Sequence, residues 1–364
     1  MTRVFESLCG QVRIQRPRYR CRRCQASFYA PQRFLDTLGG RRVGPKLLEL
    51  ATQLALYVPY SQASHLLGEC LGVSVTGTTL RRDLVQRGEE ESWRQGEQAH
   101  DCASFRYEAA PGAPSTARNR QYVEMDGCFV HQWHKKSGFE LKVGEMFSDP
   151  ILTESKKRHW ISRKQYVAHS GSAEAFGERL YAATQPWGLD DAEELYVLGD
   201  GASWIKSLWS QYYPHAEFIV DWWHVQNAVW RAVRSLIRDE NSRKQWGRRI
   251  TALLFDGQCQ AALSAVERLP ASTPQQIETR QNLSHYLDQN REGLHNYRAV
   301  QAQGIQIGSG VIEDACMDVV GRRFKHRGMS WSPRGAEALL CLRTLHLNGQ
   351  WHHYRHPDAL QPAV

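Results

Sequence analysis

The feature that most constrains the fold is an alternation of short apolar segments and amphipathic segments between residues 120 and 225. Three consecutive strands are predicted from their composition and their alternation of apolar and polar residues: QYVEMDGCFVHQW, FELKVGEMF and RKQYVAHSG. The next segment, AEAFGERLYAATQ, has the periodicity of a helix, and ELYVLGD after it predicts a buried strand. A second helix is predicted over SWIKSLWSQYY, and a further strand over EFIVDWWHV. Strands and helices that alternate in this way predict an α/β domain with a sheet at its centre.

Three strands followed by helix, strand, helix and strand is the order of an RNase H-like α/β core, with its first part at residues 120–225. Residues 226–303 have helical periodicity and Arg-, Glu- and Gln-rich faces without a clear strand, which predicts an all-helical insertion. The chain then passes through GIQIGSG into one more amphipathic helix, from about Val311 to His326. We assign residues 304–350 to the last part of the core and residues 351–364 to a tail.

Charge is distributed unevenly along the chain. The net charge is +8 over 364 residues, and residues 1–88 contain 14 Lys and Arg against 5 Asp and Glu, a net of +9, so the rest sums to −1. A basic front on a near-neutral body is typical of a nucleic-acid-binding module attached to a second, working domain. The alternative is a solubilising arm that binds RNA without specificity.

Within this front, residues 1–40 are expected to form a basic hairpin, with two short strands over residues 10–30. An extended segment would place Arg16, Arg18, Arg20 and Arg22 on one face. Cys21 and Cys24 form a C-x-x-C pair typical of zinc ribbons, but Cys9 is the only other nearby cysteine and the first histidine is His65. A structural zinc ion needs four ligands, so the zinc-ribbon-like site is incomplete, and two free thiols are the alternative to Zn²⁺.

Residues 41–96 have the pattern of a helix-turn-helix DNA-binding module. GPKLLELATQLAL is helical, SQASHLLGECLG predicts a second helix, and VSVTG a turn into TTLRRDLVQRG, which carries Arg81 and Arg82. Short helical hairpins without DNA-binding function share this pattern. Residues 97–119 lose periodicity and collect Ala, Pro, Gly and Ser, which predicts a linker between domains.

Composition excludes several classes of protein. The hydrophobic fraction of 41% and charged fraction of 23% exclude a wholly disordered or fibrous chain. No apolar run approaches the roughly 18 residues that a membrane span needs, and the first ten residues lack the apolar core of a signal peptide. An odd count of 9 cysteines fits a reducing compartment, so we expect a cytoplasmic protein with no membrane partner.

Three acidic residues lie where a soluble protein has little structural need for them. Asp126 is in the middle of a strand, and Asp200 ends the buried run Leu195–Leu198, at the edge where α/β domains bind ligands. Glu313 is in the first turn of the last helix, in line with Met317, Val320 and Phe324, so we expect it to face the sheet.

Each carboxylate also has a purely structural alternative. Asp126 could be a polar residue on a half-exposed strand, Asp200 a helix cap and Glu313 a favourable charge at a helix N-terminus. Together they are harder to explain in this way, because carboxylates about 4 Å apart repel by roughly 4 kcal/mol at an effective dielectric constant near 20. Mg²⁺ or Mn²⁺ would relieve that repulsion, and two such ions can activate water and stabilise a leaving 3′ oxygen in phosphoryl transfer.

These residues also carry a family likeness. The sequence resembles bacterial insertion-sequence DDE transposases of the ISKra type, whose catalytic core is related to that of Mutator-like elements. The matching motifs are MDG with Asp126, LGDGASWI with Asp200, the D-x-x-H of IVDWWH and GSGVIE with Glu313. The likeness extends from the GQVRIQRPRYRCRRC segment to Trp351.

The resemblance implies that Asp126, Asp200 and Glu313 form the metal-binding catalytic triad, with Asp221 and His224 as accessory residues beside it. A strand-end Asp and a packed His are the structural alternative for the last two. Members of the family usually carry a second C-x-x-C pair upstream, and this chain begins too close to Cys9 to hold one. The resemblance thus implies either a start inside a longer reading frame or a truncated copy. Candidate DNA-binding residues are Arg16, Arg18, Arg20, Arg22, Arg81, Arg82, Arg322, Arg323 and Lys325.

The function expected is a cytoplasmic, nucleoid-associated DDE transposase that binds terminal inverted repeats and catalyses metal-dependent DNA cleavage and strand transfer. Its partners would be double-stranded DNA, both inverted repeats and target, and further copies of itself on paired ends. The alternatives are a repurposed, non-catalytic DNA-binding repressor and a nuclease that cuts without strand transfer.

Overall fold

A computed structural model of the chain describes residues 2–15, 17–29, 42–104, 120–148, 151–153, 158–161, 163–189 and 192–352. The chain divides into two compact units, each of which is described by itself. Unit 1 comprises Met1–Arg94, Val130–Gly138 and Val320–Val364, and unit 2 comprises Gln95–Phe129 and Phe139–Val319. In the part of the chain that is described, no helix is both long and apolar enough to cross a membrane.

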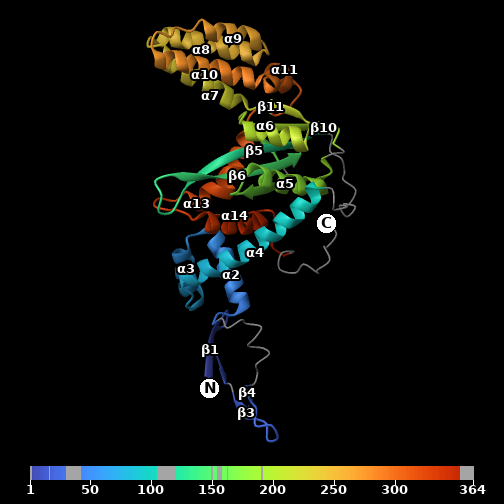
Figure 1. Cartoon of the computed structure of the whole chain (residues 1–364), viewed down its shortest axis with the longest axis vertical. Coiled ribbons are helices and arrows are strands. Elements are labelled where there is room, and N and C mark those ends of the chain that lie inside the picture. Colours follow the sequence, from blue (N-terminus) through green and yellow to red (C-terminus); the bar gives the residue numbers. More distant parts are fainter. Residues whose placement is uncertain are drawn as a thin grey trace. The chain divides into compact units, whose positions relative to one another are not determined.

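The centre of unit 2 is a five-stranded mixed sheet in the order β11–β10–β5–β6–β9 (Figure 1). Its strands are β5 (Arg120–His131), β6 (Gly138–Ser148), β9 (Lys164–His169), β10 (Glu194–Gly199) and β11 (Glu217–Val220). β5, β10 and β11 are parallel, whereas β6 and β9 are antiparallel. The expected α/β class is confirmed, and all five predicted strands are present. Two short strands, β7 (Ile151–Thr153) and β8 (Arg158–Trp160), form a separate pair that the sequence pattern did not predict.

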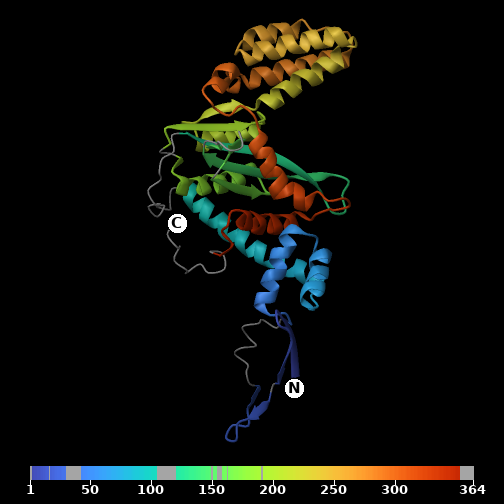
Figure 2. The ribbon, with the colours of Figure 1, turned by 180° about the vertical axis from the view of Figure 1, so that it is seen from behind.

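Helices cover both faces of this sheet. α5 (Ala173–Thr184), followed by the short η1 (Gln185–Trp187), packs with Phe176 and Leu180 against Gly144 of β6. α6 (Ser203–Tyr212) places Ile205 against the end of β10 and close to Met125 of β5. α12 (Gly310–Cys316) lies on the opposite face, where it contacts Glu124 of β5 (Figure 2). Neighbouring side chains on a strand point to opposite faces, so β5 contributes to both layers.

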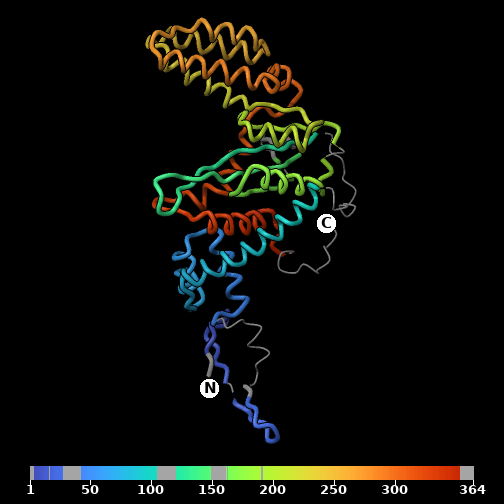
Figure 3. Tube along the Cα trace, viewed as in Figure 1, coloured from blue at the N-terminus to red at the C-terminus, as the bar shows by residue number. Residues whose placement is uncertain are grey.

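Helices follow β11 until the chain returns to the sheet. They are α7 (Trp222–Leu236), α8 (Glu240–Phe255), α9 (Cys259–Glu267), α10 (Pro274–Gln289), η3 (Arg291–Gly293) and α11 (Tyr297–Ala302). Residues 226–303 are all described and contain no strand, as predicted for the insertion. The predicted strand EFIVDWWHV is strand only to Val220, because Asp221 caps α7 and ends the extended run. Figure 3 traces the path from β11 through α7–α10 and back.

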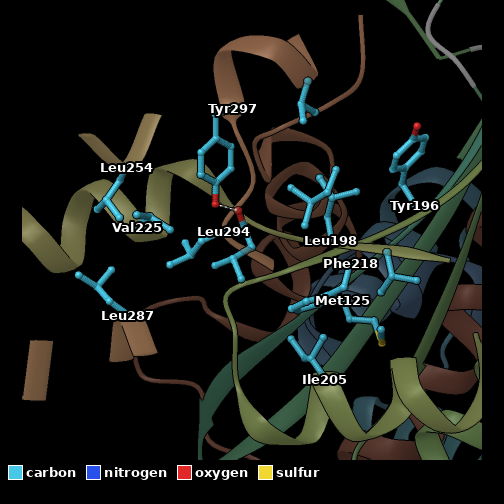
Figure 4. Packing of buried hydrophobic residues seen from close by; sticks show 14 of the residues in the cluster. Met125, Tyr196, Leu198, Ile205, Phe218, Val225, Leu254, Leu287, Leu294 and Tyr297 are labelled. Carbon is cyan, nitrogen blue, oxygen red and sulfur yellow. Dashed lines mark hydrogen bonds between the residues drawn. The ribbon is translucent and has the colours of Figure 1, made fainter. Parts of the chain in front are cut away.

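One hydrophobic core joins the sheet and the insertion of unit 2. Leu198 and Phe218 of the sheet belong to the same buried cluster as Leu254, Leu287 and Tyr297 of the insertion (Figure 4). The Tyr297 hydroxyl donates a hydrogen bond of 2.7 Å to the Val220 carbonyl at the end of β11. The insertion therefore packs as part of the unit and fixes the strand end that carries Asp221.

Unit 1 begins with two short hairpins rather than the single hairpin predicted for residues 10–30. β1 (Thr2–Ser7) pairs with β2 (Gly10–Gln15), and β3 (Arg18–Arg20) pairs with β4 (Ser27–Tyr29). Gly10 takes a φ of +91° in the first turn, a conformation that favours glycine. Pro17 separates the two hairpins, since proline cannot donate to a strand ladder.

The helices of unit 1 include α2 (Pro45–Tyr57), α3 (Tyr60–Leu71), the first part of α4 (Gly77–Ala103) and α14 (Pro333–Leu347). The three helices predicted between residues 44 and 88 are therefore present. α4 continues to Ala103, so the segment predicted as a linker, 97–119, begins as helix. Its remainder from residue 105 lies outside the described residues.

The predicted helix from Val311 to His326 is interrupted. α12 passes into a π-helical turn, η4 (Met317–Gly321), and then into the short α13 (Arg322–Phe324). A π turn inserts one extra residue and rotates the following side chains around the axis. Met317 is consequently 52% exposed, although the 3.6-residue period places it in line with the buried Val320 and Phe324.

Candidate active site

Two of the three predicted catalytic carboxylates are neighbours at the end of the parallel strands. Glu124 of β5 is paired in register with Leu198 of β10. Continuing both strands by two residues places Asp126 beside Asp200. Adjacent strands are about 4.8 Å apart, so these two carboxylates share one edge of the sheet.

A third carboxylate, Asp221, follows the next parallel strand. Gly199 of β10 pairs with Val220 of β11, and the Asp221 amide donates to the Gly199 carbonyl at 2.8 Å. Asp221 is fully buried and caps α7 by accepting the Trp223 amide at 2.9 Å. Its second oxygen lies 2.5 Å from Nδ1 of His224. The predicted D-x-x-H pair is therefore in direct contact.

The helix that carries Glu313 is tied to two of these strands. The Ile312 amide donates to Glu124 at 2.9 Å, and Cys316 Sγ lies 3.8 Å from Asp126 Oδ2. The loop before α12 adds the Ser309 amide, which donates to Asp221 at 3.2 Å. α12 is thus held directly over the strand ends by its own backbone and by Cys316.

The Glu313 side chain itself does not face the sheet, contrary to the expectation from its apolar stripe. It is exposed, and Oε1 accepts a hydrogen bond of 3.1 Å from Ser309 Oγ. Ile312, Ala315 and Cys316 are the buried residues of α12. The buried face of α12 ends at Cys316, because the π turn begins at the next residue. Glu313 lies at the edge of that buried face, where its carboxylate remains accessible to solvent.

The electrostatics of the strand ends show that negative charges crowd together. The pKa of Asp126 is raised, chiefly by burial and also by the charge of Asp200. His224 has a raised pKa because Asp221 accepts its hydrogen bond, and the charges of Asp200 and Asp126 act in the same direction. The pKa of Asp221 is lowered by its hydrogen bonds from His224, Ser309 and Trp223, which outweigh its burial. The surroundings of His224, with three aspartates nearby, therefore favour its protonation relative to a free imidazole.

The donor set suits a hard divalent cation, since carboxylate oxygens are the ligands that Mg²⁺ prefers. Within the described residues, no three His, Cys, Asp or Glu side chains stand close enough together to hold one ion. Asp126 and Asp200 supply the neighbouring pair, and Glu313 is the accessible acid on the helix above them. Asp126 also has the raised pKa of a carboxylate that a bound cation would stabilise.

Two buried glutamates extend the acidic cluster and were not among the predicted site residues. Glu124 is buried beneath α12, and burial together with the charges of Glu145, Asp221 and Glu313 raises its pKa. Glu145 of β6 is also fully buried, and its pKa is raised to about 7. The parity of Glu124 with Asp126 on one strand is the only sequence signal that could have found the first, and none points to Glu145.

A cavity of about 830 Å³ opens from Asp200 and His224 along the insertion. α7 contributes Trp223, which is half exposed, and Arg231, while α10 contributes Asn282 and Tyr286. The Tyr286 hydroxyl donates to the Asp200 carbonyl at 3.2 Å. Residues of both insertion helices line the cavity, which combines an aromatic ring, a cation and amides next to Asp200.

The family model described as "Uncharacterised protein family (UPF0236)" matches residues 111–356, more than half of the chain. The chain belongs to this family. No curated protein matches this UPF0236 member. Among solved structures, it is similar to the "Drosophila P element transposase strand transfer complex", with 10% sequence identity and a TM-score of 0.34. That match covers 88% of this chain and 96% of the other.

The basic residues predicted to bind DNA fall into different environments in the UPF0236 chain. Arg18 and Arg20 of β3 and Arg22 in the following turn are exposed, whereas Arg16 lies outside the described residues. Arg81 and Arg82 are exposed on α4, and Arg322 and Lys325 are exposed around α13.

Arg323 was predicted to bind DNA phosphate, with a solvated basic helix end as the alternative, and the burial of its side chain excludes the solvated end. The side chain is fully buried, and its Nε donates to the Ala55 carbonyl of α2 at 2.9 Å. Burial lowers its pKa to about 10, so the guanidinium remains charged at neutral pH. The π turn before α13 rotates Arg323 inward, which no local pattern indicated.

The C-x-x-C pair of this UPF0236 protein lies in the turn of the second hairpin. The backbone amides of Cys24 and Arg23 and the Cys24 thiol lower the pKa of Cys21. Cys9 lies in the turn of the first hairpin and is exposed. Among the described residues there, no three His, Cys, Asp or Glu side chains stand close enough together to hold a metal ion.

Proposed function

We propose that the protein is a DNA transposase of the DDE type, which cuts DNA at the end of a mobile element and joins the freed end to a target. One observation carries the proposal: Asp126 of β5 and Asp200, which directly follows β10, lie near each other at the end of two parallel strands, next to the helix that bears Glu313. The strand order β11–β10–β5–β6–β9, in which the sheet strands β5, β6 and β9 precede α5, supports an RNase H-like core. The helical insertion between Asp200 and Glu313 and the motifs that resemble the ISKra type agree with it.

In this proposal, Asp126, Asp200 and Glu313 hold two Mg²⁺ or Mn²⁺ ions. When bound, these ions activate the attacking oxygen and stabilise charge on the leaving 3′ oxygen. Glu313 is exposed, and among the described residues its side chain accepts a hydrogen bond from Ser309, so it can move towards the strand ends by rotation of its side chain. Asp126 and Asp200 are held in place by hydrogen bonds from the Gly127 and Ala202 amides.

The reaction proceeds in two balanced steps. Water attacks the scissile phosphorus and loses a proton to solvent, while the bond to the 3′ oxygen breaks and that oxygen takes up a proton from solvent to become the free 3′-OH. The freed 3′-OH then attacks a target phosphodiester, loses its proton and displaces the 3′ oxygen of the target strand. His224, which is held by Asp221, would contact the phosphate and orient it, and the cavity lined by α7 and α10 would receive the unpaired strand end.

DNA contacts away from the site are assigned to exposed basic side chains of unit 1. Arg18, Arg20 and Arg22 would bind phosphates of the inverted repeats, and Arg81 and Arg82 would approach the duplex from α4. Arg322 and Lys325 are candidates for the same role. A second copy of the chain would hold the other end of the element, because joining two ends requires two sites.

The proposal is tested with Glu313→Gln protein and with Asp314→Asn as a matched control, since Asp314 is the next exposed acid on the same helix. The substrate is a duplex carrying the DNA that flanks the gene, and a supercoiled plasmid serves as target, with Mg²⁺ or Mn²⁺ present. We expect cleaved and joined products from the parent and from Asp314→Asn, and a loss of at least about 100-fold with Glu313→Gln.

Each other outcome overturns part of the proposal. Cleavage by Glu313→Gln at the parental rate removes Glu313 from the site. Cut DNA without joined product identifies a nuclease, and binding of the flanking DNA without any cleavage identifies a repressor.

A further inference from the structure

Unit 1 contains a second large cavity, of about 880 Å³, which belongs to a different part of the chain from the acidic cluster. One wall is the face of α4 that bears Thr78, Arg81, Arg82, Val85, Gln86 and Glu89. The remaining walls are the start of α3, Trp133 in the turn between β5 and β6, and residues 328–335 before and within α14. Arg323 of α13 closes the bottom.

The lining of this cavity is strongly cationic. Arg81, Arg82, Arg323 and Arg334 all contribute, and Glu89 is the single acidic residue among the described lining residues. Arg334 neutralises Glu89 through a two-point ion pair, in which Nη2 lies 2.6 Å from Oε2. Three arginines therefore remain without an acidic partner in the described lining, which is an environment for an anion.

Two buried polar groups at the cavity wall lack a partner within the described residues. Arg323 is 0% exposed, its Nε and Nη1 contact Ala55 and Met329, and its Nη2 has no hydrogen-bond acceptor. The Tyr60 hydroxyl is also buried and unpaired. A buried donor that makes no hydrogen bond costs free energy, and both of these residues line the cavity.

The same cavity presents an aromatic surface that is held rigidly. Trp133 is 52% exposed, and its amide donates to the Trp331 carbonyl at 2.9 Å. The Trp331 amide in turn donates to the His131 carbonyl at 2.9 Å, so the hairpin turn is fixed at two points. His134 takes a φ of +58° and stacks its ring on Trp133 at 4.1 Å between centroids. A strained non-glycine residue that fixes a half-exposed indole is typical of a ligand-binding surface.

We propose that this cavity is a nucleotide-binding site, in which Arg81, Arg82 and Arg323 hold the phosphate and Trp133 stacks on the base. Each part of the cavity matches one part of a nucleotide. A guanidinium group can donate two parallel hydrogen bonds to phosphate oxygens, and an exposed indole ring can stack on any base. The volume lies within the range of small-molecule and cofactor sites.

The site does not depend on the catalytic proposal, because none of its residues belongs to the acidic cluster. The nucleotide has two possible sources, a free nucleotide and a single nucleotide within a DNA strand. Both present the same phosphate and base to the cavity, and the experiment separates them.

The test is isothermal titration calorimetry of the full chain with dAMP, deoxyadenosine and inorganic phosphate. We expect dAMP to bind one site per chain and more tightly than either fragment. Arg82→Ala and Trp133→Ala should each weaken dAMP binding by about tenfold or more. Trp133→Ala should leave phosphate binding unchanged, a pattern that a general loss of structure would not produce.

Arg327→Ala and Trp93→Ala are the matched controls, since both side chains are exposed and neither lines the cavity. Arg323 is left intact because it also holds α2. Competition by a short single-stranded oligonucleotide would assign the site to a nucleotide of a DNA strand, and its absence to a free nucleotide. Absence of dAMP binding, or equal loss with the control variants, would overturn the proposal. So would equal affinity for dAMP and inorganic phosphate, because it would leave the base without a role.

Discussion

Asp126 combines the position proposed for a metal ligand with a structural cost that can be measured. Its carboxylate lies next to Asp200 on the neighbouring strand, and burial and that charge raise its pKa. A negative charge in such a place destabilises the folded chain unless a cation is bound.

We therefore expect Asp126→Asn to raise the stability of the metal-free protein by about 1 kcal/mol, because the amide keeps the hydrogen bond from Gly127 and removes the repulsion. Millimolar Mn²⁺ should raise the melting temperature of the parent but not of the variant. Thermal unfolding with and without Mn²⁺ measures both effects. A variant that still responds to Mn²⁺ would show that Asp126 is no ligand.

Glu145 provides a pH-dependent contribution to stability. It is 0% exposed, neither carboxylate oxygen accepts a hydrogen bond from a described residue, and its nearest cation is Lys164 Nζ at 3.5 Å. Its pKa rises from an ordinary value of 4.5 to about 7, so the folded state binds the proton more tightly than the unfolded state. The contribution of Glu145 to the free energy of unfolding is therefore fully present below about pH 4.5 and is lost as the pH rises through about 7.

Glu145→Gln should abolish this pH dependence. At pH 8 we expect the variant to be more stable than the parent, by at most about 3 kcal/mol, and at pH 4 the two should be nearly equal. Denaturant unfolding across this range is the measurement, with Glu140→Gln on the same strand as control. A parallel pH profile for parent and Glu145→Gln would contradict the raised pKa that burial gives this carboxyl group.

At the scale of elements, the order of strands and helices was predictable and their ends were not. Alternation and periodicity are local properties, so all five strands of the central sheet and the helical insertion could be read from the chain. The predicted strand at 217–225 failed at Asp221, because its side chain caps α7 and accepts the amide of Ser309, 88 positions away. An interaction of that range leaves no local pattern.

The insertion is also an element that positions the site. Tyr297 is buried in the shared core and donates to Val220, the last residue of β11 before Asp221 (Figure 4). Its pKa is raised well above the ordinary value by burial, so it remains a neutral donor.

Tyr297→Phe should destabilise the protein by about 1–2 kcal/mol, since the Val220 carbonyl would lose its partner in a buried place. Tyr212→Phe is a suitable comparison, because that ring is only partly buried and its hydroxyl makes no hydrogen bond to a described residue. Denaturant titration at neutral pH measures both. Equal stability of the Tyr297→Phe variant and the parent would show that the insertion does not hold β11 through this bond.

At the scale of the whole molecule, charge and chemistry are separated along the chain. Residues 1–88 carry the net charge of +9, while the acidic cluster lies in unit 2, in the near-neutral remainder. This separation agrees with a division between binding DNA and acting on it.

If Arg18, Arg20 and Arg22 bind phosphates, replacing all three by Gln should reduce the slope of log affinity against log salt by about 0.9 for each phosphate that is no longer neutralised, or about 3 in total. A matched variant replaces Arg238, Arg248 and Arg249 of the insertion, which are also exposed, and should change the slope little. Filter binding of a duplex at several salt concentrations is the measurement. Equal slopes for parent and hairpin variant would remove the hairpin from the DNA interface.

The sequence by itself determined the alternation of elements, the insertion and the acidic residues at the strand ends, because each depends on spacing within a few residues. Only the tertiary structure decided that Asp126 lies beside Asp200, that Glu313 is exposed and that Arg323 turns inward. The first depends on strand register, and the other two on one extra residue in a π turn. The burial of Glu145 could not be predicted from the sequence either. Whether a carboxyl group is buried depends on which residues pack over its strand, and those residues are distant in the chain.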